Sequence, residues 1–115
     1  MKDANYPWFI LVPDRENVTE IFQLDETDQK QLITESSLLS STITRLFNAD
    51  KINIAALGNL VPQLHLHHIV RYTTDAAWPA PVWGKLPAKP YTEKEIDQVF
   101  DKLKAGLGEI LEYAR

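Results

Sequence analysis

All three histidines of the chain lie in one short stretch, residues 61–71, and no other stretch constrains the fold as strongly. Polar and apolar residues alternate in its first half, which is typical of a β-strand whose successive side chains point to opposite faces. In such a strand Gln63, His65 and His67 share one face, whereas His68 points to the other. The pattern therefore predicts that two histidines are displayed together and that the third points away.

The chain of 115 residues has the length of one domain. It has no cysteine, which excludes a disulfide framework and thiolate zinc sites and is typical of a reducing compartment. A net charge of −4 and a pI near 5.3 argue against binding to a nucleic-acid polymer, which needs clustered Lys and Arg. Because no apolar run approaches the roughly 18 residues of a membrane span, and no signal-peptide pattern is present, we expect a cytoplasmic protein that does not enter a membrane.

Two more segments are predicted to be strands. Residues 6–13 form a short apolar run bounded by prolines, too short for a helix. This run begins almost at the first residue, so we expect an edge strand or one that pairs with a partner outside the chain. Residues 51–57 form the other strand, and Gly58 and Asn59 connect it to the histidine strand as a hairpin-like pair, which places Asn53 beside the histidines.

Two segments are predicted to be helices. One covers residues 25–47 and opens with an aspartate cap; Ser36 stands in its apolar stripe as a small residue where a neighbour packs closely. Thr92 and Glu95 form a capping box that starts a last helix. We expect this helix to pack on the sheet through an apolar stripe that consists of Ile96, Val99, Phe100, Leu103, Leu107, Ile110 and Leu111.

Residues 75–90 contain four of the chain's seven prolines and two tryptophans. Prolines at this density prevent a regular element, and Trp78 and Trp83 need somewhere to bury. We expect this loop to pack on the body of the domain or on a partner subunit, with both tryptophans as packing residues rather than substrate contacts. Together these elements predict one α+β domain over residues 1–115, with an antiparallel sheet, one long central helix and a C-terminal helix.

Three interpretations of the paired imidazoles are open. His65 and His67 can supply two ligands of a metal ion, but the third would have to be an Asp, a Glu or His68, which points away. One imidazole can instead attack a phosphate ester or anhydride while its neighbour holds it in place. The third interpretation is a solvated strand face without chemistry, which composition alone favours.

Neutral polar residues around the histidines are suited to phosphate. The side chains of Asn53, Asn59 and Gln63 can donate hydrogen bonds to phosphate oxygens, and Gly58 lets backbone amides approach an anion closely. For His68 we expect a buried, hydrogen-bonded side chain rather than a ligand.

Read in order, residues 61–71 resemble the signature of the histidine triad (HIT) family, in which three histidines alternate with apolar residues. The family's motif is often preceded by Val-Pro and followed by Arg, and this chain has both. Aligned on them, Gln63 takes the first triad position, His65 the second and His67 the third, while His68 stands where the family has an aliphatic residue. A register that begins at His65 loses the Val-Pro match.

The resemblance continues outside the motif. Asn53 and the pair Gly58 and Asn59 resemble the family's phosphate-binding residues. Residues 8–13 and 77–84 are similar to a bacterial branch of HIT-like, diadenosine-tetraphosphate-hydrolase-like proteins in which Gln recurs at the first triad position. Because the family places one or two strands before the equivalent of residues 8–13, the resemblance implies that this chain lacks them or completes its sheet with a partner.

The resemblance also implies a function. In the family the second histidine attacks the α-phosphorus of a nucleoside phosphoanhydride or phosphoramidate and forms a nucleotidyl-histidine, which water hydrolyses; this role falls on His65. His67 would hydrogen-bond at the phosphate, and the three phosphate-binding residues would hold its oxygens. Gln63 cannot take up a proton, so the implied alternative is a nucleotide-binding or regulatory protein with weak or no turnover. No metal or other cofactor is implied, and the expected assembly is a homodimer.

Overall fold

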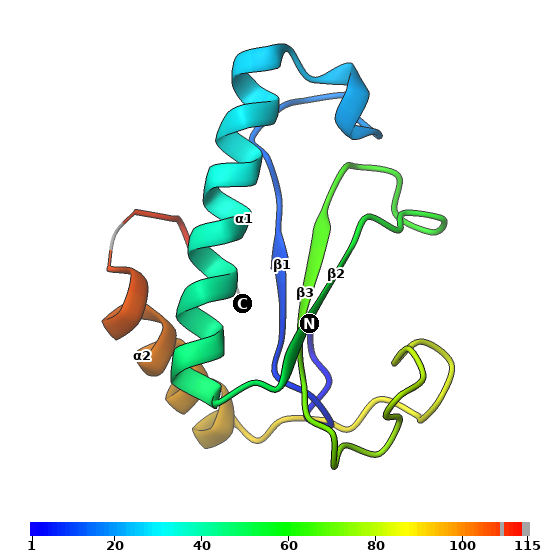
Figure 1. The fold of residues 1–115 in the computed structure, drawn as a ribbon, viewed down its shortest axis with the longest axis vertical. Helices are drawn as coiled ribbons and strands as arrows, with labels where there is room; N and C mark the ends of the chain where they lie inside the picture. The colour runs from blue at the N-terminus through cyan, green and yellow to red at the C-terminus, as the bar shows by residue number, and fades with distance from the viewer. Residues whose placement is uncertain (109, 114–115) are drawn as a thin grey trace.

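The computed structural model of the protein describes residues 1–108 and 110–113. Three strands form one antiparallel sheet in the order β1-β3-β2, with two helices on the same side of it (Figure 1). The elements are β1 Trp8–Leu11, the 3-10 helix η1 Ile21–Gln23, α1 Glu26–Phe47, β2 Lys51–Ala55, β3 Leu66–Arg71 and α2 Glu93–Leu107. The predicted α+β fold with an antiparallel sheet and two helices is confirmed. None of the described helices is long and apolar enough to cross a membrane.

The strand that carries two of the histidines, β3, is the centre of the sheet. It pairs with β1 on one side and with β2 on the other, and all six of its residues are buried. His67 lies opposite Ile10 of β1 and Ala55 of β2. The predicted place of Asn53 beside the histidine strand is confirmed, because Asn53 lies opposite Ile69. The first strand lies at an edge of the sheet, which is one of the two arrangements expected for it.

β3 begins later than its alternating sequence indicates. The alternation predicts Gln63 and His65 inside the strand, but both lie in the loop before it. The backbone amide of Leu64 donates to the carbonyl of Val18 at 2.8 Å, so this segment finds its hydrogen-bond partner in the loop after β1 rather than in the sheet. β2 also ends earlier than predicted.

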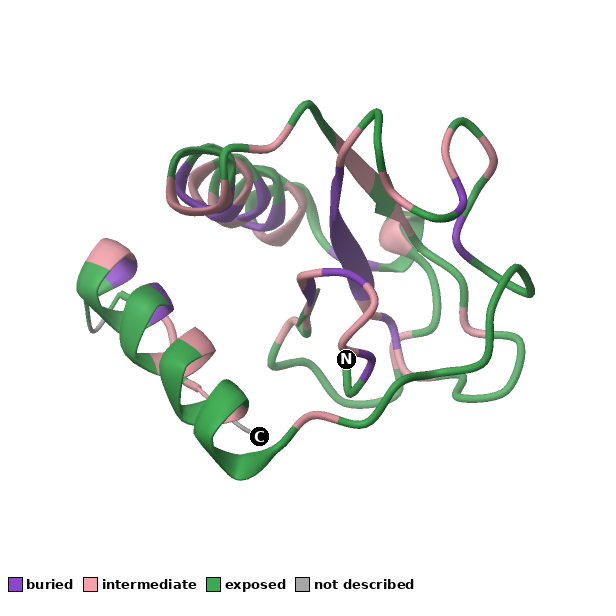
Figure 2. Ribbon diagram, turned by 90° about the horizontal axis from the view of Figure 1, so that it is seen from below, coloured by how far each residue is buried: buried purple, intermediate pink, exposed green. Residues whose placement is uncertain are grey.

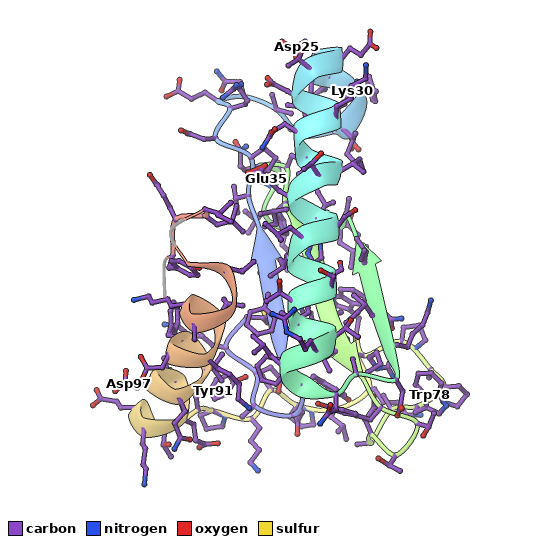
Figure 3. All side chains as sticks on the ribbon, turned by 60° about the vertical axis from the view of Figure 1, so that its left-hand side comes forward. Asp25, Lys30, Glu35, Trp78, Tyr91 and Asp97 are labelled. Carbon is purple, nitrogen blue, oxygen red and sulfur yellow. The ribbon has the colours of Figure 1, made fainter. Side chains whose placement is uncertain are left out.

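The ends of α1 agree with the sequence prediction. The carboxylate of Asp25, at the top of the helix in Figure 3, accepts the backbone N–H of Asp28 at 2.7 Å. Asn48 ends the helix in a left-handed conformation. Ser36 is buried within the apolar side that packs on the sheet, as predicted for a small residue with a close neighbour.

α2 opens with the predicted capping box, in which Thr92 and Glu95 each accept the backbone amide of the other. The prediction that its stripe packs on the sheet is confirmed in part: Leu103 and Leu107 share one apolar cluster with Val70 of β3, while the main neighbour of the helix is α1. In Figure 2 the less exposed side of α2 is turned toward α1. Gly106 allows this contact, since a Cβ there would lie 2.7 Å from Cγ2 of Thr42. The helix ends at Leu107, so the last two members of the predicted stripe lie beyond it.

The opposite face of the sheet is covered by the proline-rich loop, which confirms that this segment is irregular and packs on the body. Figure 3 shows Trp78 on this loop, away from α2. The buried residues of this side form one apolar cluster that consists of Tyr6, Trp8, Ile69, Ala77 and Val82.

A buried ion pair ties this loop to the sheet. Arg71 is 1% exposed, and its guanidinium donates to both carboxylate oxygens of Asp75, at 2.8 and 3.1 Å. It also donates to Oδ1 of Asn53 at 2.7 Å and to the carbonyl of Ala80 at 2.8 Å. The hydrogen bonds from Arg71 lower the pKa of the Asp75 carboxyl to about 2. A buried charge is tolerated only when it is paired and hydrogen-bonded, so these contacts hold β2, β3 and the loop together.

Replacing Asp75 by Asn tests the ion pair. Because the folded-state pKa of about 2 lies below the ordinary value of 3.8, ionised Asp75 stabilises the fold above about pH 4, and this contribution is lost as the pH falls through about 2. We expect Asp75→Asn to lower the free energy of unfolding by about 2–3 kcal/mol at neutral pH. Urea unfolding should show this difference closing between about pH 4 and pH 2. Asp101→Asn, on the exposed side of α2, is the control, and a difference independent of pH would contradict the assignment.

Replacing Gly106 by Ala tests the contact between the helices. Alanine favours a helix over glycine by about 1 kcal/mol, yet its Cβ would lie 2.7 Å from Thr42 and 3.0 Å from Leu46. We expect the clash to outweigh the propensity and to cost about 1–2 kcal/mol of stability, measured by chemical unfolding. Ala105→Gly, at an exposed position of the same helix, measures the propensity alone. A Gly106→Ala variant more stable than the parent would show that α1 and α2 can move apart at this contact without loss of stability.

Candidate functional site

The half-buried ring of His65 has one nitrogen fixed by the backbone. Its Nδ1 lies 2.7 Å from the carbonyl oxygen of Gln63. A carbonyl oxygen accepts hydrogen bonds and cannot donate them, so Nδ1 carries a proton, and in the neutral tautomer that fits this contact Nε2 carries the lone pair. The unprotonated nitrogen is the nucleophilic atom of a neutral imidazole. The loop before β3 thus holds His65 in a form that can attack an electrophile.

His67 lies against His65, with ring centroids 4.9 Å apart. Its ring is buried, and its Nδ1 accepts a hydrogen bond from the indole Nε1–H of Trp8 at 2.9 Å. The ring of Trp83 packs edge-on at 5.3 Å. Burial, and after it the neighbouring His65, lowers the pKa of His67 from 6.5 to about 4. His67 is therefore uncharged at neutral pH.

His68 points to the opposite face, as the strand pattern predicts. Its Nε2 lies 2.7 Å from Oγ of Ser36 on α1, and its Nδ1 lies 3.1 Å from the carbonyl oxygen of Leu66. The ring is fully buried, and burial lowers its pKa. The prediction of a buried, hydrogen-bonded histidine with a structural role is confirmed.

Gly58, predicted to let backbone amides approach phosphate, lies beside His65. A Cβ built on Gly58 would be 3.9 Å from Cε1 of His65 and 3.2 Å from the carbonyl oxygen of Val61. Its φ of +146° is a conformation that side chains rarely adopt, so glycine lets the loop turn this close to the histidine. Asn59 follows on the exposed part of the same loop, and its side chain makes no hydrogen bond to other described residues.

Asn53 lies on β2, on the same face of the sheet as His67. Its Oδ1 accepts a hydrogen bond from Arg71 at 2.7 Å, which leaves its NH₂ group as the one that can donate to a ligand. The buried Arg71 thus sets the orientation of this amide. Sequence reasoning used Arg71 only to align the motif.

Gln63, expected from the family resemblance at the first triad position, contacts His65 through its backbone. Its carbonyl accepts from His65, whereas its side-chain Nε2 donates to the carbonyl of Arg15 at 3.0 Å, in the loop after β1. The structure brings the two histidine rings together as the strand pattern predicts. The loop conformation of residues 63–65 directs the Gln63 amide to the Arg15 backbone.

The sequence predicts Trp8 in a buried strand and Trp83 as a packing residue of the loop, and both rings contact His67, with centroids at 5.6 and 5.3 Å. Trp83 is 38% exposed rather than buried. For Trp8 the contact follows from its place opposite Ile69, on the face of His67, and this register is not specified by the sequence. Trp83 stands in an irregular loop, where the sequence has no periodicity to place it.

Two imidazoles in contact, with amide donors around them, suit nucleophilic attack on a phosphoryl group. In the part of the chain that the structure describes, no group of three or more His, Asp or Glu side chains is arranged to hold a metal ion. The candidate site consists of two imidazoles and nearby amide groups, built from side chains and backbone of β1, β2, β3 and the loop before β3.

Comparisons with known proteins assign the chain to a family. The family model described as the HIT domain matches residues 1–74, which include the three strands and the three histidines. No curated protein matches the chain significantly.

Three solved structures are similar to the chain. A histidine triad protein from Marinobacter aquaeolei VT8 is 52% identical, with a TM-score of 0.92, over 96% of this chain and 81% of that chain. One from Bradyrhizobium japonicum is 50% identical, with a TM-score of 0.89, over 92% and 79%. One from Sinorhizobium meliloti 1021 is 42% identical, with a TM-score of 0.90, over 93% and 79%. With this likeness and the match to the HIT domain model, the chain belongs to the histidine triad (HIT) family.

Proposed function

We propose that the protein is a nucleotide hydrolase or nucleotidyl transferase that acts at the α-phosphate of a nucleoside phosphoanhydride or phosphoramidate. Members of the HIT family are commonly nucleotide hydrolases or transferases. The observation that carries the proposal is the hydrogen bond between Nδ1 of His65 and the carbonyl of Gln63 at 2.7 Å, which selects the tautomer of the neutral ring with its lone pair on Nε2. An imidazole held in this form beside a glycine loop is suited to attack on phosphorus.

In the first step Nε2 of His65 attacks the α-phosphorus. A phosphorus–nitrogen bond forms while the bond to the leaving group breaks, and the leaving group departs with its electron pair. The Nδ1 proton stays in its hydrogen bond to the Gln63 carbonyl, which stabilises the positive charge on the imidazole. In the second step water, or the hydroxyl of another acceptor in a transferase, attacks the same phosphorus and releases a proton to the solvent as the new phosphorus–oxygen bond forms. The phosphorus–nitrogen bond breaks, its electron pair returns to Nε2, and His65 is regenerated.

We assign the phosphate oxygens to neutral donors. The NH₂ group of Asn53, the backbone amides around Gly58 and the side chain of Asn59 are the proposed contacts. His67 adds a hydrogen bond rather than a positive charge, because its pKa of about 4 leaves it neutral. The site thus binds an anionic group through dipoles.

Gln63 favours a second candidate function, a nucleotide-binding or regulatory protein with weak or no turnover. An amide neither gains nor loses a proton near neutral pH, so Gln63 cannot protonate a leaving group as a histidine can. Its side chain is also engaged by the Arg15 carbonyl at 3.0 Å. The catalytic and the regulatory candidate functions share one proposed nucleotide site. They differ in whether the bound nucleotide is turned over.

Finer features of the assignment are part of the same proposal. We propose that the protein belongs to the bacterial diadenosine-tetraphosphate-hydrolase-like branch, works in the cytoplasm without a metal or other cofactor, and forms a homodimer from single domains of residues 1–115. The dimer is supported by β1, which has one neighbouring strand and carries the exposed Ile10, with the exposed Val12 directly after it. An exposed apolar edge favours pairing with a second chain.

Replacing His65 by Asn removes the nucleophile and keeps a polar side chain. We expect turnover of diadenosine tetraphosphate and of a fluorogenic adenosine phosphoramidate to fall by roughly 10³-fold or more. Binding of adenosine monophosphate, measured by titration calorimetry, should persist. Acid quench followed by mass spectrometry should detect a nucleotidyl adduct on the parent protein and none on the variant.

His68→Asn is the matched control, since His68 has a similar Nδ1 contact to a carbonyl but faces α1. It should lower the Tm and keep turnover; if it fails to fold, Ser36→Ala removes the same contact with α1 more mildly. Parent turnover that survives His65→Asn would overturn the catalytic assignment. Tight nucleotide binding without parent turnover would support the regulatory candidate.

Replacing Gln63 by His restores a titratable group at the first triad position. We expect turnover to rise by about tenfold or more, chiefly for the phosphoramidate, whose amine must be protonated to leave. The measurement is kcat/KM for both substrates at neutral pH. Gln63→Asn keeps an uncharged amide and serves as the control. An unchanged rate in Gln63→His would show that proton supply at this position does not limit turnover.

A further inference from the structure

His67 takes its hydrogen bond from Trp8, a residue 59 positions away in the sequence, on the edge strand β1. Both side chains are buried, with Trp8 5% and His67 6% exposed. Trp8 lies opposite Ile69 in the sheet and therefore shares the face of His67. The indole and the imidazole meet in a part of the site from which water is excluded.

The indole N–H is a hydrogen-bond donor without acceptor capacity. Nδ1 of His67, 2.9 Å from it, must therefore be unprotonated, and the single proton of the neutral ring lies on Nε2. A proton on Nδ1 would set two N–H groups against each other in a buried place. The contact thus disfavours both the other neutral tautomer and the imidazolium, in agreement with the lowered pKa of His67.

The indole of Trp8 is itself held from several sides. Tyr6 packs edge-on against it at 6.5 Å and Trp83 at 5.4 Å. The backbone carbonyl of Trp8 also accepts a hydrogen bond from the N-terminal ammonium of Met1 at 2.9 Å. A buried ring packed in this way has little freedom to turn, so its N–H has a fixed direction before any ligand binds.

We propose that Trp8 is a positioning residue that holds His67 as the Nε2-protonated tautomer, complementary to the Nδ1-protonated tautomer of His65. The pair then offers a substrate one lone pair and one N–H. The use of that N–H rests on the proposed function, because a phosphoryl oxygen gains negative charge during attack by His65 and needs a donor. In the opposite tautomer His67 would present a second lone pair to an anionic substrate and repel it.

Nitrogen-15 NMR of the parent protein, labelled in both histidine and tryptophan, tests the tautomer without any substitution. We expect His67 to show an unprotonated Nδ1 and a protonated Nε2 at neutral pH, with a scalar coupling across the hydrogen bond to Nε1 of Trp8. His65 should show the reverse protonation. A protonated Nδ1 on His67 at neutral pH would overturn the proposal.

Trp8→Phe removes the N–H and keeps an aromatic ring. Trp83→Phe is the matched control, because Trp83 packs on the same imidazole at 5.3 Å and makes no hydrogen bond to it among the described contacts. We expect Trp8→Phe to shift the His67 tautomer ratio about 3- to 10-fold toward Nδ1–H, a shift that corresponds to the loss of one hydrogen bond. The pKa of His67 should also rise. Trp83→Phe should leave the ratio unchanged. An equal shift in both variants would overturn the role of the N–H.

Turnover is the second readout. In Trp8→Phe we expect kcat for diadenosine tetraphosphate to fall about tenfold with little change in KM, because the donor acts on charge that develops in the transition state. If the parent protein has no turnover, the proposed catalytic function fails while the NMR result still decides the tautomer. If turnover occurs and kcat is unchanged in Trp8→Phe despite an altered tautomer ratio, the positioning role is overturned.

Discussion

A strand buried on both faces must provide a partner for every polar side chain that it carries, and β3 carries three such side chains. His67 finds its partner on β1, His68 on α1, and Arg71 in the loop that follows the strand. These contacts connect β3 to the edge strand, to the helix on one face and to the loop on the other. The arrangement of the whole domain around its site therefore depends on satisfying the polar groups of one strand.

The need to pair each buried polar side chain gives the adjacent residues His67 and His68 different surroundings. His67 and His68 are the same residue type, yet one touches another imidazole and the other contacts a serine of α1. The site has little formal charge, because the pKa of His67 is low and Arg71 is neutralised by Asp75. The whole chain has a net charge of −4. The proposed binding of an anionic substrate therefore relies on short-range dipoles, so salt should affect that binding only weakly.

Features set by neighbouring residues could be predicted from the sequence, and features set by distant contacts could not. The cap at Asp25 and the capping box at Thr92 are local, and the structure confirms both. The predicted start of β3 was wrong, because polar and apolar residues can alternate equally in a strand and in a loop whose backbone amides form hydrogen bonds outside the sheet. The position of α2 depends on what Gly106 faces across the helix contact. The bond from Trp8 needs the sheet register, which the chain alone does not specify.

The orientation of the His65 ring is set by a backbone atom, the carbonyl oxygen of residue 63. Every amino acid supplies that oxygen, whatever its side chain. A substitution at position 63 can therefore leave the direction of Nε2 of His65 unchanged, provided that the loop keeps its path. Under the proposed function, the side chain at position 63 can then vary in its ability to supply a proton while the imidazole keeps its orientation. Position 63 is thus a place where the chemistry of the proposed site can change without a change in the rest of the site.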